Sequence, residues 1–106
     1  MILTTTSTVD GHSVTRYHGI VTAEVIIGAN IFRDVFSSVR DVVGGRAGGY
    51  ERALAGAREA ALDEAKAAAK ELGANGIVGI DFDYEVLGEA NGMMLVSVTG
   101  TAVKMA

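Results

Sequence analysis

Residues 30–50 read NIFRDVFSSVRDVVGGRAGGY, and this stretch decides the fold because it joins two predicted helices through a glycine-rich segment. Asn30 is a suitable N-cap for a short amphipathic helix, because apolar residues recur every three or four positions after it. Gly44-Gly45 predicts the end of that helix. A long alanine-rich helix is expected to begin after Gly48-Gly49 and to end at Leu72.

The second helix is expected to have one apolar face that consists mostly of alanine. The positions on this face are Tyr50, Leu54, Ala57, Ala61, Ala65, Ala68 and Leu72. Charged residues occupy the opposite face, at Arg52, Glu59, Asp63, Lys66 and Lys70. Because alanine is small, this helix can approach a sheet closely, but each residue buries little area.

Segments on both sides of the helices have the period-two alternation of β-strands. Residues 2–5 predict a short strand, and residues 13–27 predict a longer one after the Asp10-Gly11 turn. The expected core face of the longer strand consists of Tyr17, Gly19, Val21, Ala23, Val25 and Ile27. Its other face consists of Arg16, His18, Ile20, Thr22, Glu24 and Ile26.

The C-terminal part predicts a hairpin, with strands over residues 77–88 and 92–105 around the loop 89–91. If Gly88 lies opposite Gly92, the apolar sets of both strands share one face. The same register pairs Asp81 with Thr99, Asp83 with Ser97 and Glu85 with Leu95. Residues 1–106 are therefore expected to form a single α+β domain, with one antiparallel sheet in a β-β-α-α-β-β order and helices covering one face.

The composition limits the partners of this 106-residue chain. A formal net charge of −4 argues against nucleic acid or an anionic membrane. There is no apolar run long enough to span a membrane and no evident signal peptide, so a cytoplasmic location is expected. Cysteine is absent, which excludes disulfides and thiolate ligands. Hydrophobic residues make up 49% of the chain and the mean hydropathy is +0.32, so we expect surplus apolar surface and self-association.

Three segments carry a resemblance to a known family. They are GIVTAEVIIGANIFRDVFSSVRDVVGGRAGGYE at residues 19–51, LGANGIVGIDFDYEVLG at 72–88 and MMLVSVTGTAVK at 93–104. Together with the alanine-rich helix, they resemble the YbjQ family of small bacterial and archaeal proteins. That resemblance implies an α+β subunit related in architecture to dodecin, and a closed homopentamer in which residues 2–5 bridge neighbouring subunits. The family is biochemically uncharacterised, and heavy-metal binding is the function suggested for it.

A divalent metal is the cofactor that this resemblance suggests, and one set of residues is a candidate for binding it. The set consists of His18, Glu24, Asp81, Asp83 and Glu85, all expected on the non-core face of the sheet. Alternate residues of a strand lie about 6.8 Å apart, so two carboxylates of one strand need help from a neighbour to hold an ion. Soft metals also prefer thiolate, thioether and imidazole ligands, whereas this chain has no cysteine and two histidines. A solvated or ion-paired sheet face explains the same residues.

A second candidate site lies around the glycine-rich segment, where a small molecule or anion would bind between subunits. Its residues are Arg33, Asp34, Arg40, Asp41, Arg46, Tyr50 and Glu51. Free amides at a helix N-terminus can bind phosphate, but the segment lacks the lysine and the Ser or Thr of a P-loop and does not follow a strand. Ion pairs along the helices and contacts between subunits explain the same charges.

The chain shows no combination of nucleophile, base and orienting group that indicates a reaction, so we expect no enzyme. The favoured function is an oligomeric scaffold or binding protein of unknown ligand, with a second copy of itself as its partner. The alternatives are a heavy-metal-binding protein, and a small-molecule carrier or enzyme with its site between subunits.

Overall fold

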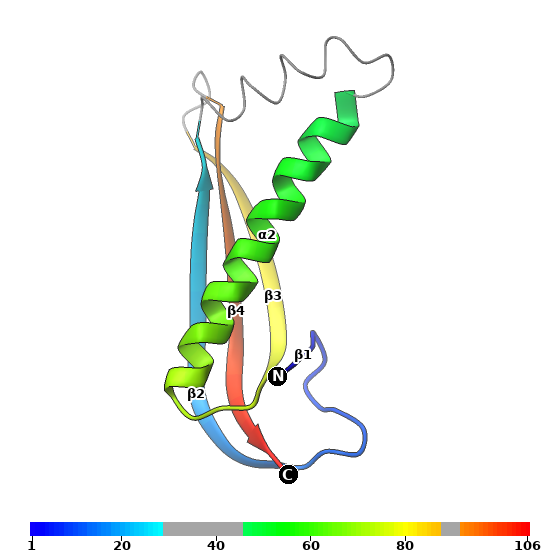
Figure 1. The fold of residues 1–106 in the computed structure, drawn as a ribbon, viewed down its shortest axis with the longest axis vertical. Helices are drawn as coiled ribbons and strands as arrows, with labels where there is room; N and C mark the ends of the chain where they lie inside the picture. The colour runs from blue at the N-terminus through cyan, green and yellow to red at the C-terminus, as the bar shows by residue number, and fades with distance from the viewer. Residues whose placement is uncertain (29–45, 88–91) are drawn as a thin grey trace.

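The computed structural model describes residues 1–28, 46–87 and 92–106. In these segments a long helix lies across a four-stranded sheet (Figure 1). The elements are β1 (Ile2–Leu3), β2 (Val14–Ile27), α2 (Arg46–Glu71), β3 (Gly76–Leu87) and β4 (Met93–Met105). The first predicted helix and the hairpin loop 89–91 lie outside the described residues. Within them, no helix is long and apolar enough to cross a membrane.

The strand order is β1-β3-β4-β2. β4 pairs in antiparallel fashion with β2 and with β3, and the register of the hairpin is the predicted one, with Asp81 opposite Thr99 and Asp83 opposite Ser97. The expectation of a wholly antiparallel sheet is wrong at β1, which pairs in parallel with the first residues of β3. β1 therefore lies at the edge of the sheet, and a bridge from residues 2–5 to a neighbouring subunit stays a prediction.

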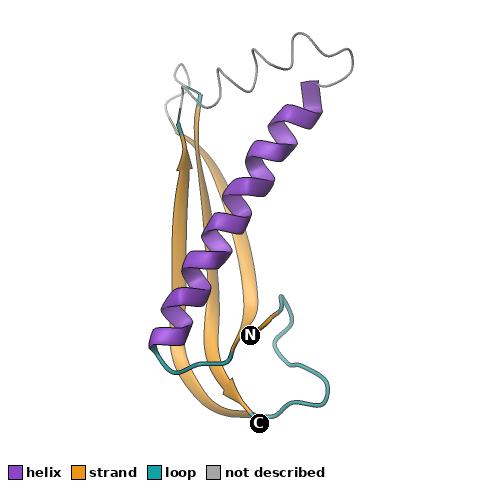
Figure 2. Ribbon diagram, viewed as in Figure 1, coloured by secondary structure: helices purple, strands orange, loops and turns teal. Residues whose placement is uncertain are grey.

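α2 covers one face of the sheet and lies mainly over β2 and β4 (Figure 2). The buried positions of the helix are alanines spaced four residues apart, namely Ala57, Ala61, Ala65 and Ala69. Leu72, which was predicted on the apolar face of the helix, is instead 46% exposed, because the helix ends at Glu71 and the chain turns away. Small side chains at the fully buried positions allow the helix to lie close to the sheet, as the sequence predicted, and the half-buried Leu54 and Leu62 pack beside them.

The two ends of α2 differ in how well they were predicted. The helix begins at Arg46, so Gly48 and Gly49 lie inside its first turn and not in a loop before it. At the other end, Gly73 adopts a left-handed φ of 87°. Its N–H bonds the Lys70 carbonyl at 3.0 Å, and the Ala74 N–H bonds the Ala69 carbonyl at 3.0 Å. This is a Schellman motif, which satisfies the last helical carbonyls.

A glycine bulge in β3 changes which face its side chains occupy. The register shifts between Val78 and Asp81, where Gly79 has a φ of 63°. Because of this extra residue, Ile77 and Ile80 both pack under the helix although they are three residues apart. Val78 lies between them and packs with a different cluster on the other face.

A similar bulge in β2 makes part of the predicted core face wrong. The register shifts between Tyr17 and Gly19, and Gly19 has a φ of 108°. Tyr17, expected in the core, is 70% exposed. His18, expected on the opposite face, lies on the helix side, with its Cε1 atom 3.8 Å from where a Cβ on Gly73 would be. Beyond the bulge the prediction holds, since Val21, Ala23 and Ile27 are buried.

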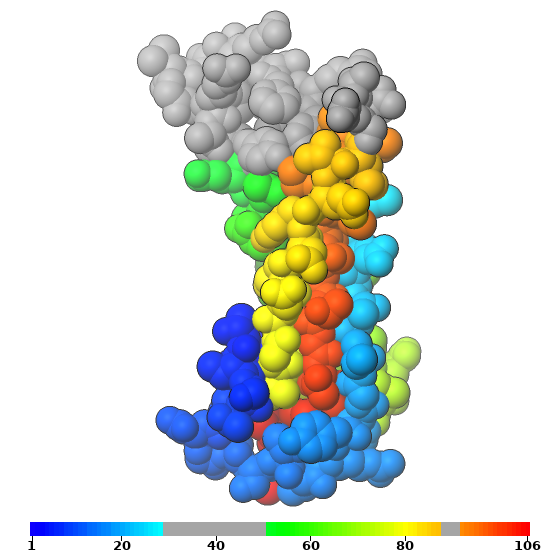
Figure 3. Space-filling view, turned by 180° about the vertical axis from the view of Figure 1, so that it is seen from behind, coloured from blue at the N-terminus to red at the C-terminus, as the bar shows by residue number. Residues whose placement is uncertain are grey.

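The sheet therefore buries opposite faces at its two ends. Above the bulges the apolar residues face α2, as in the cluster that contains Val21, Ile77 and Val98. Near the chain termini a second cluster forms on the other face, from Val78, Val103 and Met105, with Ile2, Val9 and Val14 packed against it. The N-terminal segment covers this second cluster, and no other described segment covers the strands above it (Figure 3).

Candidate functional site

The uncovered side of the sheet, opposite α2, carries four of the five predicted metal ligands; we call it the open face (Figure 3). Asp81, Asp83 and Glu85 alternate along β3 and are all exposed. They lie on this face because their cross-strand partners Thr99, Ser97 and Leu95 alternate with the buried residues of β4. Glu24 of β2 is exposed on the same face, opposite Ser97.

The strand order separates these carboxylates. Glu24 and Asp83 both lie beside Ser97, but on opposite sides of β4. They are thus two strand spacings apart, roughly 9–10 Å between backbones. Neighbouring carboxylates on β3 are about 6.8 Å apart along the strand. No group of three His, Asp or Glu side chains in the described segments is placed to hold a metal ion.

The two histidines lie away from these carboxylates. His18 was grouped with Glu24 because strict alternation puts residues 18 and 24 on one face, but the bulge places His18 beside Gly73 at the end of α2. His12 is an exposed turn residue, as expected, and its Nδ1 lies 3.2 Å from the Ala106 carbonyl oxygen. Neither imidazole joins the open face.

The available donor set does not fit a soft heavy metal. Such metals need thiolate, thioether or imidazole ligands in one place. Cysteine is absent from the sequence, and the two histidines lie on different parts of the fold. Two of the four methionines, Met94 and Met105, are buried. The exposed donors of the open face are carboxylates and hydroxyls, which prefer hard ions.

The second candidate site falls largely outside the described residues. Arg33, Asp34, Arg40 and Asp41 belong to residues 29–45, and Arg46 and Tyr50 are described only as backbone of α2. Glu51 is exposed on that helix. Proximity among these residues therefore stays a prediction.

The open face also carries exposed apolar side chains along β2. Ile20 is 79% exposed and Ile26 is 58% exposed, although both belong to a regular strand. Together with Tyr17 they make β2 the apolar side of the open face, opposite the acidic side on β3. Exposed Thr22 and Glu24 lie between the two isoleucines, so these are separate apolar side chains along the strand and not one continuous patch.

Two sheet edges lack a partner strand in the described part of the chain. β2 is the last strand of the sheet, so its outer edge is unpaired over all 14 residues. β3 pairs with β1 only at Gly76 and Ile77, and the segment after β1 extends the contact as far as Ile80. The rest of that edge, residues 81–87, is also unpaired. Unpaired edges present rows of N–H and C=O groups that favour pairing with another chain.

The sequence did not reveal two polar features of the structure. Arg58 Nη1 of α2 donates a hydrogen bond to the Tyr84 hydroxyl of β3 at 3.3 Å, which joins helix and sheet at an exposed position. The N-terminal segment borders an open hollow whose lining includes three threonines. The threonines at positions 4–6 and 8 were the available signal, because threonine hydroxyls favour local hydrogen bonds to the backbone in turns.

Comparison with known proteins supports a class of small α+β proteins of uncharacterised function. The structure is similar to that of a protein of unknown function from Pediococcus pentosaceus, which belongs to the DUF74 family. The TM-score is 0.65 at 18% sequence identity, and the match covers 100% of this chain and 98% of that one, so the likeness concerns the fold. Residues 1–106 match the model of the YbjQ family, described as "Putative heavy-metal-binding". The chain belongs to the YbjQ family, as the sequence predicted.

Proposed function

We propose that this protein is a self-assembling binding protein whose copies join edge to edge, with β2 of one copy beside β3 of the next. The observation that carries the proposal is the outer edge of β2, which has 14 residues, no partner strand in the described segments and exposed Ile20 and Ile26 beside it. Natural proteins protect long sheet edges with charge, proline or a covering segment. This edge has only Arg16 and Glu24 as charged residues, and the chain has no proline.

The second edge has the right direction and length to receive the first. β2 and β3 both run antiparallel to β4, so they run the same way in one subunit. In a ring whose axis follows the strands, β2 of each copy would meet the free upper part of β3 of the next without reversal. A closed ring uses both edges of every copy, which is the solution that cyclic oligomers reach. Five copies is the number that the family resemblance implies.

Light scattering with charge variants tests this proposal. The double variant Ile20→Lys and Ile26→Lys adds two charges along β2 at positions that are already exposed, so the subunit should still fold. The control, Ala55→Lys and Ala60→Lys, adds the same charge at exposed positions of α2. We expect an oligomer for the natural chain and the α2 variant, and a smaller species for the β2 variant with an unchanged circular dichroism spectrum. A natural chain that is monomeric at micromolar concentration would refute the proposal.

Heavy-metal binding is the second candidate, because the family's description favours it. The donor set described above argues against a soft-metal site within one subunit. A third possibility, a carrier or enzyme with a site between subunits, depends on the charged residues 33–41, which lie outside the described part.

A further inference from the structure

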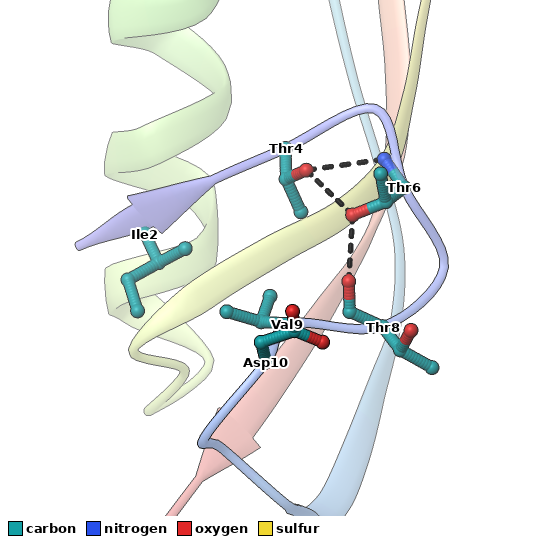
Figure 4. Close-up of a pocket in the computed structure, with 6 residues that line it drawn as sticks. All are labelled: Ile2, Thr4, Thr6, Thr8, Val9 and Asp10. Atoms are coloured by element: carbon teal, nitrogen blue, oxygen red, sulfur yellow. Dashed lines mark hydrogen bonds between the residues drawn. The ribbon is translucent and has the colours of Figure 1, made fainter.

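The N-terminal segment forms a hollow of about 450 Å³ between β1 and the chain that returns toward β2 (Figure 4). Its lining residues are Ile2, Thr4, Thr6, Thr8, Val9 and Asp10. Ile2 and Thr4 form one wall, Val9 and Asp10 form the opposite wall, and Thr6 and Thr8 lie between them. The hollow belongs to a single subunit and does not depend on the proposed assembly.

The hydrogen bonds among the threonines fix the direction of their protons. Thr6 Oγ1 lies 2.6 Å from the Thr8 carbonyl oxygen, which can only accept, so the Thr6 hydroxyl must donate to it. Thr4 Oγ1 lies 2.7 Å from Thr6 Oγ1, and because the Thr6 proton is already used, the Thr4 hydroxyl must be the donor. Thr4 Oγ1 in turn accepts from the Thr6 N–H at 3.1 Å.

As a result, the hollow presents hydrogen-bond acceptors. Each hydroxyl oxygen has two lone pairs, and the bonds above use one on Thr4 and one on Thr6. Each oxygen can therefore accept one more bond but has no proton left to donate. The Asp10 carboxylate adds a negative charge and further acceptor sites. The Thr8 hydroxyl can rotate to accept as well.

We propose that this hollow binds a primary alkylammonium group. An ammonium has three N–H donors and no acceptor, which matches oxygens on Thr4 and Thr6 and the charge of Asp10. Ile2 and Val9 supply apolar surface for the alkyl chain. The net charge of −4 also favours a cation over an anion.

Other ligand classes fit the lining less well. A sugar hydroxyl both donates and accepts, whereas the protons of Thr4 and Thr6 are already used and the Thr8 hydroxyl is the one donor left among the three threonines. A phosphate or carboxylate would meet Asp10 as a like charge. A calcium ion needs six to eight oxygen ligands, usually from several carboxylates, and this hollow has one carboxylate.

Two sources can supply the same chemistry: a free aliphatic amine and the side chain of a lysine in another chain. We would therefore titrate the isotope-labelled protein with three probes and follow its backbone amides by NMR. The probes are n-pentylammonium, Nα-acetyl-lysine N-methylamide and the uncharged n-pentanol. The variants are Asp10→Asn and a control, Asp83→Asn, which removes another exposed carboxylate, on the open face.

We expect n-pentylammonium to shift the amides of residues 4–10, and to bind about tenfold more weakly to the Asp10→Asn variant, as for loss of one charge-assisted hydrogen bond. The Asp83→Asn variant should bind like the natural chain, and n-pentanol should not shift these amides. Equal binding of the lysine amide shows that the hollow accepts a lysine side chain as well as a free amine, and its failure restricts the ligand to a free amine. The inference is wrong if neither amine shifts residues 4–10, or if Asp83→Asn weakens binding as much as Asp10→Asn.

Discussion

Replacing Gly100 by alanine should destabilise the fold, although the same change usually stabilises a chain. Gly100 is buried in β4, opposite the bulge of β3. A Cβ atom there would lie 2.6 Å from Ile77 Cγ2, 3.2 Å from Ile80 Cγ1 and 3.3 Å from the Val78 carbonyl oxygen. The shortest of these distances is below any ordinary contact between carbon atoms. Ile77 must therefore move, and it is only 1% exposed.

The expected magnitude follows from what must move. Forcing a buried side chain off its rotamer costs about 0.5–1.5 kcal/mol, and overpacking a core typically costs about 1–3 kcal/mol in total. Alanine also restricts the unfolded chain, which offsets about 0.4–1 kcal/mol. We expect a net loss of about 1–2 kcal/mol in the free energy of unfolding. For a domain of this size that corresponds to roughly 5–15 °C in the melting temperature.

Gly56→Ala is the matched control. Gly56 lies inside α2, and a Cβ atom there would meet nothing within 4 Å. We expect this variant to be more stable than the natural chain by about 0.5–1 kcal/mol, because glycine is a poor helix former. Urea unfolding should be followed by circular dichroism at one protein concentration, since assembly links stability to concentration. If Gly100→Ala is as stable as Gly56→Ala, the close packing at the β3 bulge is not as described.

Three further predictions concern the helix, the C-terminal strand and metal binding. Ala61→Leu should lower the free energy of unfolding by about 1–3 kcal/mol, because Ala61 is fully buried against the sheet. The control Lys66→Leu should have only a mild effect on stability, and equal melting temperatures of the two variants would mean that the helix faces the other way. Asn75→Ala should lower the free energy of unfolding by about 1–3 kcal/mol, because the Asn75 side-chain amide donates to the Met105 carbonyl at 2.9 Å and accepts from the Met105 N–H at 2.7 Å. Unchanged urea unfolding would show that water replaces both bonds. Calorimetry should find that zinc and copper(II) bind no tighter than tens of micromolar, because thiolates are absent and the described residues form no closed ligand set. His18→Ala should change this affinity little. Submicromolar binding that His18→Ala abolishes would make metal binding the leading function.

The sequence predicted the strands well where their alternation is uninterrupted. The register of β3 and β4 followed from requiring both apolar sets on one face, and the structure has Asp83 opposite Ser97 as expected. The error in the core face of β2 occurs at Gly19, because a bulge adds one residue and looks like ordinary alternation in the sequence. Glycine has no side chain whose character could mark the change. The early start of α2 was missed for a related reason, since the low helix propensity of Gly48 and Gly49 is overridden in the fold.

The faces on which the candidate site residues lie were predicted correctly only away from the β2 bulge. The shared face of Asp81, Asp83 and Glu85 was correct, because these residues lie beyond the β3 bulge. His18 was wrongly added to them, because it lies at the β2 bulge. To predict that Glu24 is separated from β3, one must know the order of the strands in the sheet. Alternation within one strand contains no information on that order.

The glycine bulge in β3 determines which residues of the strand lie on each face of the sheet. Deleting one residue at Gly79 would leave the chain on either side unchanged in composition but would shift its alternation by one position. Either Asp81 and Asp83 would then point toward α2, or Ile77 would leave the core for the opposite face of the sheet. Single-residue insertions and deletions are usually tolerated in loops. In this protein the sensitivity to such a change lies within a strand, at Gly79. A Cβ atom at this residue would meet no atom within 4 Å, so steric exclusion of a side chain is not the reason for the sensitivity.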